Sequence, residues 1–163
     1  TKLDFLNSQH MANLDLDEFI DHLRPFLEYK NIDINSHPKK DLLINSMRSS
    51  ANNLEGVALN LQCYYYDVDE YDQKAIDKFI GKSNEVLLDL KERLLNIDDW
   101  NEVNIDDVLL RYREEKELSI PKVNQPLRIA LTGSTNSPSL GMTLSLFEKE
   151  EAILRIEKLI DLI

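Results

Sequence analysis

The stretch Gln125–Leu140, QPLRIALTGSTNSPSL, is where an otherwise acidic, helix-forming chain becomes polar and rich in turn-forming residues. Pro121 and Pro126 each fix φ and lack a backbone N–H, so we expect no helix to run through this part of the chain. Positions 132–139 then hold hydroxyl, amide, glycine and proline residues, which favour turns over helix interiors. Arg128 is the single arginine of the stretch. The pattern fits a surface that binds a polar ligand, and it also fits a linker before a last helix.

Composition limits the class of protein. The 163 residues suffice for one domain or two small ones, and 42% of them are hydrophobic, which is enough for a core. No apolar run approaches the roughly 18 residues of a membrane span, and the N-terminus lacks the layout of a signal peptide. These features fit a cytoplasmic protein without a membrane partner. We also expect a monomer. The single cysteine, Cys63, excludes an intrachain disulfide and disfavours a zinc cluster.

The formal net charge of −11 argues against broad binding of nucleic acid, because such binding comes from clustered lysine and arginine side chains. A local basic strip on an acidic body is compatible with that total. The charge thus indicates recognition by a few specific contacts, with further affinity supplied elsewhere. It also favours a second hypothesis, a free-standing acidic helical interaction module without RNA binding.

Apolar residues recur at steps of three and four along most of the chain, which predicts helices. The expected helices cover 14–29, two pieces of 39–66, two pieces of 69–96, 105–118 and 142–163. We expect the first to kink or end at Pro25, the fourth and fifth to flank Gly81, and the sixth to be capped at Asn104. Only Leu127–Leu131 suggests a strand. The predicted fold class is all-α, a helical bundle or cage of two small subdomains.

The order of residues in PLRIALTG, followed by SPSL and a last helix, resembles the C-terminal anticodon-binding region of bacterial glutamyl-tRNA synthetases. The matching residues are Pro126, Leu127, Arg128, Ala130, Leu131, Thr132, Gly133, Pro138, Leu140, Lys149, Glu150, Arg155 and Ile156. Glu148 and Ser139 stand where family members usually or often have glycine. The resemblance implies three parts: the end of a stem-contact region (1–26) and two anticodon-binding helical subdomains (27–80 and 81–163).

The resemblance extends over nearly the whole chain. Residues 2–11 are similar to the segment that leaves the stem-contact region in the family, with Phe5 in place of a tryptophan. Arg48, then Leu54–Glu55, then the tyrosines at 64–66 resemble an arginine, a Leu-x-Glu type segment and an aromatic run. The spacing from Arg48 to Leu54 is two residues longer than usual.

Catalytic chemistry is absent from the sequence. Class I synthetases carry an HIGH-type motif and a KMSKS-type loop, and neither occurs here; nor does a glycine-rich phosphate loop. The histidines lack the spacing of a metal site or a catalytic triad; they are His10, His22 and His37. We expect no catalytic residue, no metal site and no cofactor in this chain. The resemblance implies a fragment of a ligase that uses ATP and Mg²⁺.

In the family, the arginine of PLR and the proline-containing turn contact the first two anticodon bases. By resemblance, the corresponding residues here are Arg128, Ser137, Pro138 and Leu140, and the implied partner is glutamate tRNA, tRNA(Glu). Arginine offers a planar fork of donors and a stacking face to an unpaired base. The alternative is that Arg128 caps the preceding chain or pairs with a carboxylate.

The third anticodon base separates tRNA(Glu), which ends in C, from tRNA(Gln), which ends in G. Members that reject tRNA(Gln) place an arginine just before the aromatic run, and alignment puts Gln62 in that slot. Arginine donors match the O2 and N3 acceptors of cytosine but face the N1–H and N2–H₂ donors of guanine, whereas glutamine offers a donor and an acceptor. We predict a non-discriminating domain that also accepts tRNA(Gln). Otherwise Gln62 is an ordinary exposed helix residue.

Several further side chains are candidates for phosphate or stacking contacts: Arg48, Tyr64, Arg111, Arg113 and Lys122. Phosphate contacts position a nucleic acid rather than specify its sequence. Arg111 and Arg113 also have acidic neighbours on their own helix, which could neutralise their charge. A run of consecutive aromatic residues usually places at least one ring in the core.

Overall fold

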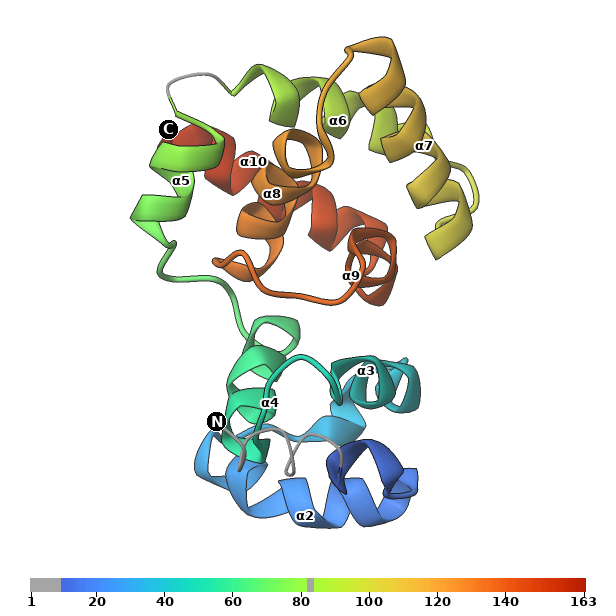
Figure 1. Ribbon diagram of the computed structural model, residues 1–163, viewed down its shortest axis with the longest axis vertical. Helices are drawn as coiled ribbons and strands as arrows, with labels where there is room; N and C mark the ends of the chain where they lie inside the picture. Colours follow the sequence, from blue (N-terminus) through green and yellow to red (C-terminus); the bar gives the residue numbers. More distant parts are fainter. Residues whose placement is uncertain (1–9, 82–83) are drawn as a thin grey trace. The chain divides into compact units, whose positions relative to one another are not determined.

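A computed structural model describes residues 10–81 and 84–163, and its regular secondary structure in those ranges is helical, without a strand (Figure 1). The all-α prediction is therefore confirmed. The chain divides into two compact units, Thr1–Asp67 and Val68–Ile163. The three-part division at residues 26 and 80 stays a prediction, and Phe5 lies outside the described residues. In the described ranges, no helix combines the length and the apolar character needed to cross a membrane.

In the first unit, residues 10–13 are α-helical, and the elements described over their whole length are α-helices and short 3₁₀ helices. They are α2 (Leu16–Tyr29), η1 (Ile34–Ser36), α3 (Lys40–Met47), α4 (Leu54–Leu61) and η2 (Gln62–Tyr64). A capping box fixes the start of α2, because the side chains of Asp15 and Glu18 each accept a hydrogen bond from the other's backbone N–H. The expected division of 39–66 into two helical pieces is confirmed, since α3 ends at Met47 and α4 begins at Leu54.

Helix α2 continues through Pro25, so of the two outcomes expected at this proline, a kink or an end, the end is wrong. Proline removes the hydrogen bond to the carbonyl of Asp21, but Pro25 is exposed and water can bond that carbonyl. Leu23 and Leu27 flank the proline and are buried, at 0% and 3% exposure. Burial of the apolar face therefore outweighs the lost backbone bond.

The second unit contains six described α-helices. They are α5 (Gln73–Phe79), α6 (Glu85–Leu95), α7 (Glu102–Glu115), α8 (Ile120–Thr132), α9 (Leu140–Leu146) and α10 (Lys149–Leu162). Helix α8 runs through the middle of this unit and packs against the other five (Figure 1). The two helices expected on either side of Gly81 are present as α5 and α6.

The helix α8 contradicts the expectation that the two prolines would exclude a helix, and also the suggested strand at Leu127–Leu131. Pro121 lies in the first turn, where a backbone N–H has no intrahelical partner in any case. Pro126 lies inside the helix and removes one bond, but it is buried together with Val123 and Leu127. The central position of α8 thus stabilises a helix that local propensity disfavours.

Two other helix boundaries differ from the expected ones. Helix α7 begins after Asn101, whose side chain accepts the backbone N–H of Asn104 at 3.0 Å, so Asn104 is not the cap. The closing helix is divided into α9 and α10, because Phe147 has an extended backbone (φ −86°, ψ 153°) and is buried. Trp100 Nε1 donates to the Phe147 carbonyl at 3.0 Å and so stabilises the break.

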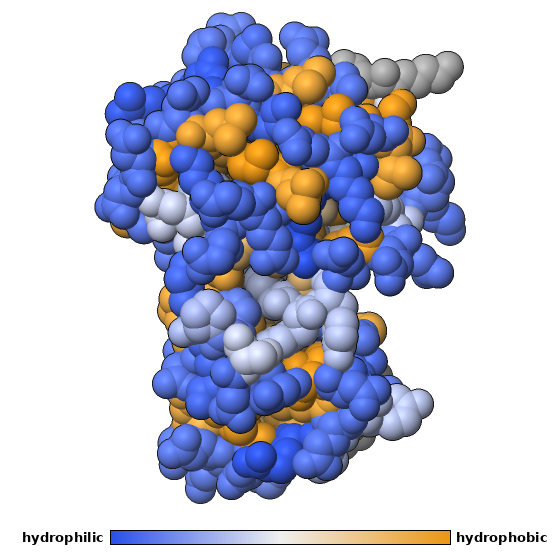
Figure 2. Space-filling model, turned by 180° about the vertical axis from the view of Figure 1, so that it is seen from behind, coloured by the Kyte–Doolittle hydropathy of each residue, from blue (hydrophilic) through white to orange (hydrophobic). Residues whose placement is uncertain are grey.

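Polar and charged side chains cover most of the face shown in Figure 2, with apolar side chains gathered in small groups. The most exposed large apolar residues of the second unit are Val103, Leu154 and Leu162. Scattered exposed apolar residues are normal on a protein surface and need no ligand to explain them.

Two basic residues of the pattern that resembles the family, Lys149 and Arg155, donate hydrogen bonds to carbonyl groups at or near helix ends. Lys149 Nζ donates to the carbonyls of Leu95 and Ile97 at 2.6 and 2.7 Å, just where α6 ends. Arg155 is 5% exposed, donates to the Leu131 carbonyl at 2.9 Å and lies over the Phe147 ring. Carbonyls at a helix C-terminus lack intrahelical partners, so these cations satisfy them and complement the helix dipole.

Gly133 ends α8 in the left-handed conformation, with φ +75°. Its carbonyl accepts the backbone N–H of Asp72 at 2.9 Å, which joins the start of the α8–α9 loop to the segment before α5. A Cβ at this position would lie 2.7 Å from the carbonyl oxygen of Glu70 and 2.9 Å from Val68 Cγ1. Glycine is therefore required both by the backbone angle and by the close approach of another chain segment.

We predict that Gly133→Ala destabilises the second unit by roughly 2–4 kcal/mol, from left-handed strain plus overpacking. Gly81→Ala is the matched control, because Gly81 has φ +66° but nothing within 4 Å of an added Cβ, so it should cost only about 1 kcal/mol. Denaturant unfolding followed by the fluorescence of Trp100, the single tryptophan, measures both variants in this unit. Equal losses would contradict the steric account.

Candidate nucleic-acid interface

The α8–α9 loop, residues 133–139, is fastened to α8 by Arg128. Arg128 Nε donates to Ser137 Oγ at 2.7 Å, and Nη2 donates to the Pro138 carbonyl at 3.1 Å. Both acceptors are neutral, so neither bond neutralises the guanidinium charge. Ser137 Oγ also accepts from the Thr143 hydroxyl at 3.0 Å, and Thr143 is fully buried. The Arg128 guanidinium, the turn at Ser137 and Pro138, and the first turn of α9 are therefore connected by hydrogen bonds. We call this group the Arg128 assembly.

The beginning of the same loop is set by Thr132. Its hydroxyl donates to the Arg128 carbonyl at 2.9 Å and accepts the backbone N–H of Ser134 at 3.3 Å. Threonine and serine use such local bonds to stabilise turns. The loop is consequently shaped at both ends before any ligand binds, which reduces the entropy cost of binding.

The end of the loop is acidic on one side. Ser139 caps α9 by accepting the Met142 N–H at 3.4 Å, and its hydroxyl donates to Glu102 Oε1 at 3.0 Å. Asp106 also lies here, and burial followed by the charge of Glu102 raises the pKa of its carboxyl, while the Gly141 N–H opposes the rise. A Cβ on Gly141 would collide with the Asp106 carboxylate. Phosphate groups are therefore disfavoured on this side.

Leu140 is buried at 2% exposure, so its side chain anchors α9 and leaves only its backbone near the surface. Ser137 and Pro138 are half-buried. Of the four residues expected to contact the first two bases, hydrogen bonds join Arg128, Ser137 and Pro138 at one turn. The fourth, Leu140, anchors the helix that follows this turn.

Gln62 lies in the other unit, at the junction of α4 and η2, and is half-buried. Its Oε1 accepts a hydrogen bond from Lys30 Nζ at 3.4 Å. Gln62 is therefore not simply an exposed helix residue.

Two of the three consecutive tyrosines donate hydrogen bonds to the segment between α2 and α3. Tyr66 donates its hydroxyl to the Asn31 carbonyl, and Tyr65 donates to the Ile34 carbonyl at 3.3 Å. Burial, and secondarily the charge of Asp33, raises the pKa of Tyr65 to about 12, so this hydroxyl keeps its proton at neutral pH. Tyr64 is only 7% exposed, which leaves little of its ring for stacking on a base.

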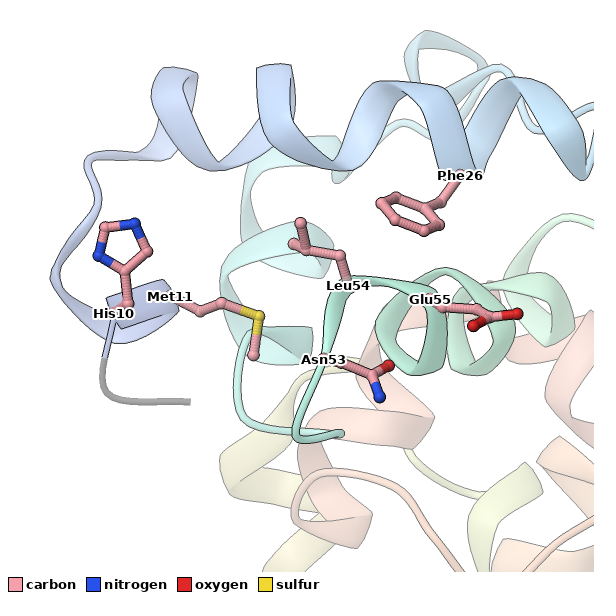
Figure 3. Close-up of a pocket in the computed structure, with 6 residues that line it drawn as sticks. All are labelled: His10, Met11, Phe26, Asn53, Leu54 and Glu55. Carbon is pink, nitrogen blue, oxygen red and sulfur yellow. The ribbon is translucent and has the colours of Figure 1, made fainter. Parts of the chain in front are cut away.

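A pocket of about 400 Å³ lies elsewhere in the first unit (Figure 3). Its lining residues are His10, Met11, Phe26, Asn53, Leu54 and Glu55. The lining is mainly apolar, and the one amide in it is already used, because Asn53 Oδ1 accepts the Gly56 N–H at 2.8 Å to cap α4. None of the expected site residues lines this pocket. Within residues 10–81 and 84–163, no group of three or more His, Cys, Asp or Glu is placed to hold a metal ion.

The anticodon binding domain family matches residues 18–160, which include both Gln62 and the α8–α9 loop. This chain belongs to that family. In the anticodon-binding domain, the Arg128 assembly lies on the second unit and Gln62 on the first, so the match covers both surfaces predicted from the sequence.

Curated relatives of this anticodon-binding domain are glutamate–tRNA ligases. The chain is 35% identical over 158 residues to the glutamate–tRNA ligase of Myxococcus xanthus, covering 96% of this chain and 33% of the ligase. It is 32% identical over 160 residues to glutamate–tRNA ligase 1 of Campylobacter hominis, covering 98% and 34%. The chain thus spans about a third of the length of these relatives.

Solved structures share the fold of the domain. The chain is similar to a glutamate tRNA ligase from Elizabethkingia meningosepticum in complex with its amino acid, with a TM-score of 0.80 and 22% identity, over 97% of this chain and 31% of that chain. It is also similar to the glutamate-tRNA synthetase from Elizabethkingia anophelis, with a TM-score of 0.77 and 23% identity, over 97% of this chain and 31% of that chain.

The other cationic candidates in the domain are not equivalent. Arg48 Nη1 donates to the Leu14 carbonyl at 2.6 Å and the guanidinium lies 5.0 Å from the Phe19 ring centroid, so Arg48 has a structural role. Arg111 pairs with Asp107 at 2.9 Å on its own helix. Arg113 is half-buried and Lys122 is exposed, which leaves these two as candidates for phosphate contacts.

Sequence reasoning missed Lys30, Thr143 and Glu102 in the surroundings of the two surfaces. A threonine inside a helix is a weak signal, because its hydroxyl competes with the backbone for hydrogen bonds. Lys30 carries no local signal, since it lies 32 positions before Gln62 in the chain.

Proposed function

We propose that this anticodon-binding domain is part of a glutamate–tRNA ligase and recognises the anticodon of tRNA(Glu). The observation that carries the proposal is the Arg128 assembly, a preformed turn of hydroxyl and carbonyl groups held by a guanidinium. RNA sequence is recognised mainly at single-stranded loops, where bases unstack and expose their hydrogen-bonding edges. A preformed polar turn with a planar cation beneath it offers both hydrogen bonds and a stacking surface to such bases. The names of the curated relatives support the choice of tRNA.

In this proposal, the first two anticodon bases contact the turn at Ser137 and Pro138 and the backbone of Leu140. Arg128 is a recognition residue and also positions the turn, because two of its nitrogens already donate to it. Lys122 and Arg113 contact phosphates, which position the RNA without specifying its sequence. A few directed contacts of this kind are compatible with a net charge of −11.

Charging of the tRNA with glutamate would belong to the remainder of such a ligase in the cytoplasm. ATP and Mg²⁺ supply the activation chemistry there, and no residue of this chain is assigned to either. The alternative, a free-standing acidic interaction module, is not favoured, because the family match covers most of the chain.

Binding of the chain to an RNA hairpin with the tRNA(Glu) anticodon tests the proposal. We expect Arg128→Ala to weaken binding about tenfold, because charge-assisted hydrogen bonds contribute roughly 1.5–3 kcal/mol. Arg128→Lys should weaken it similarly, since a lysine cannot bond Ser137 and Pro138 together in one plane. Fluorescence anisotropy at low salt provides the measurement.

Arg24→Ala is the matched control, because Arg24 is an exposed arginine of α2 that pairs with Asp21. It should change the affinity little. If the wild type fails to bind the hairpin even at low salt, the acidic-module alternative is favoured instead. Wild-type affinity in the Arg128 variants would contradict the assigned surface.

We further propose that the domain accepts tRNA(Gln), because Gln62 occupies the slot where an arginine would exclude a terminal G. The amide of glutamine carries both a donor and an acceptor and no charge, so it can meet either cytosine or guanine. Its half-buried position at the start of η2 is compatible with a base approaching from solvent.

The intact ligase should therefore attach glutamate to purified tRNA(Gln), and Gln62→Arg should reduce that charging while retaining most charging of tRNA(Glu). Gln73→Arg, on the exposed side of α5, adds the same charge elsewhere and should leave both activities unchanged. Aminoacylation assays with each tRNA provide the comparison. No charging of tRNA(Gln) by the wild type would refute the proposal.

A further inference from the structure

Lys30 and Gln62 form a hydrogen-bonded pair on the first unit, which we call the Lys30–Gln62 pair. Lys30 Nζ lies 3.4 Å from Gln62 Oε1, and both side chains are half-buried. An ammonium group has donors only, so it is the oxygen of the amide that faces Lys30. The amide nitrogen of Gln62 consequently points away from the lysine.

The backbone on either side holds Lys30 in place. Lys30 is the C-cap of α2, its N–H donates to the Leu27 carbonyl at 3.1 Å, and a cation at a helix C-terminus is favourable. Asn31 then adopts φ +55°, and its carbonyl accepts the hydroxyl of Tyr66. Tyr66 itself follows η2, the element that begins at Gln62, so both members of the pair are tied to the same local structure.

The pair presents donors to a ligand. Lys30 occupies the amide oxygen, and among the described residues no acceptor bonds Gln62 Nε2. What the pair offers outward is therefore the N–H₂ group of glutamine beside an ammonium charge. We propose that Lys30 is a specificity-determining residue, which orients Gln62 as a donor and biases the domain toward a third anticodon base with acceptors. This inference rests on the proposed function of Gln62.

Cytosine fits that description better than guanine. Its O2 and N3 are adjacent acceptors on the Watson–Crick edge, whereas guanine places N1–H and N2–H₂ donors there. A bond of 3.4 Å is longer than the usual 2.7–3.2 Å, so the amide can turn and offer its oxygen to guanine. The pair thus gives a graded preference for C over G, where an arginine would exclude G.

The test compares two RNA hairpins that differ only in the third anticodon base, C or G, in their affinity for the chain. The wild type should prefer C. Lys30→Met keeps the aliphatic stem but removes the donors, and it should reduce the C/G affinity ratio by about threefold to tenfold, mainly by weakening the C hairpin. Lys30→Arg retains donors at this position and should retain the preference.

Lys40→Met is the matched control, because Lys40 belongs to the same unit but bonds Asn35 at 3.3 Å. It removes the same charge and should lower both affinities equally, if at all. An unchanged C/G ratio in Lys30→Met, with both hairpins still bound, would overturn the role of Lys30 and leave the proposed function intact. Failure of the wild type to bind either hairpin would overturn both.

Discussion

The two hydrogen bonds from the Arg128 guanidinium to Ser137 and Pro138 are the interaction on which the candidate site depends. They join the central helix of the second unit to a loop that would otherwise be a polar linker. Everything that positions α8 therefore also positions the loop. The buried Arg155 satisfies the Leu131 carbonyl at the end of α8, and Gly133 turns the chain where a side chain would collide with residue 70. The site thus depends on the interior of the unit and not on the loop sequence alone.

The division of the chain into two units gives the proposed recognition two separate physical parts. On the second unit, a rigid turn offers hydroxyl and carbonyl groups with a cation behind them. On the first unit, Lys30 and Gln62 offer donors beside a positive charge. Under the proposed function, the carboxylates of Glu102 and Asp106 would repel phosphate near one end of the turn, so the acidic character of the chain would orient RNA as well as weaken its binding.

Much of the fold could be predicted from the sequence, because apolar spacing reports which helix faces are buried. That spacing led to the all-α class and to the paired helices around Gly81. It failed where long-range burial outweighs local preference. Pro25 and Pro126 lie within helices because the apolar faces around them are buried, and the break at Phe147 is stabilised by a hydrogen bond from Trp100, 47 positions earlier.

The arrangement of the candidate site could be predicted from the sequence to a similar degree, and its role stays a prediction. The order of residues from Pro126 to Leu140 pointed to the turn, but the bonds that make Arg128 part of it become visible only in three dimensions. The contact of Lys30 with Gln62 joins residues whose separation in the chain carries no periodic signal. Burial of Tyr64 likewise depends on packing, so its side chain is an anchor where the sequence alone suggested a stacking surface.

The most direct test of the central claim is an NMR titration of the chain with the anticodon stem-loop of tRNA(Glu), followed through backbone amide shifts. Recognition at the Arg128 assembly predicts that the largest early shifts occur in residues 134–140, together with the region around Gln62. Shifts confined to other surfaces, with residues 134–140 unchanged at saturation, would contradict the account.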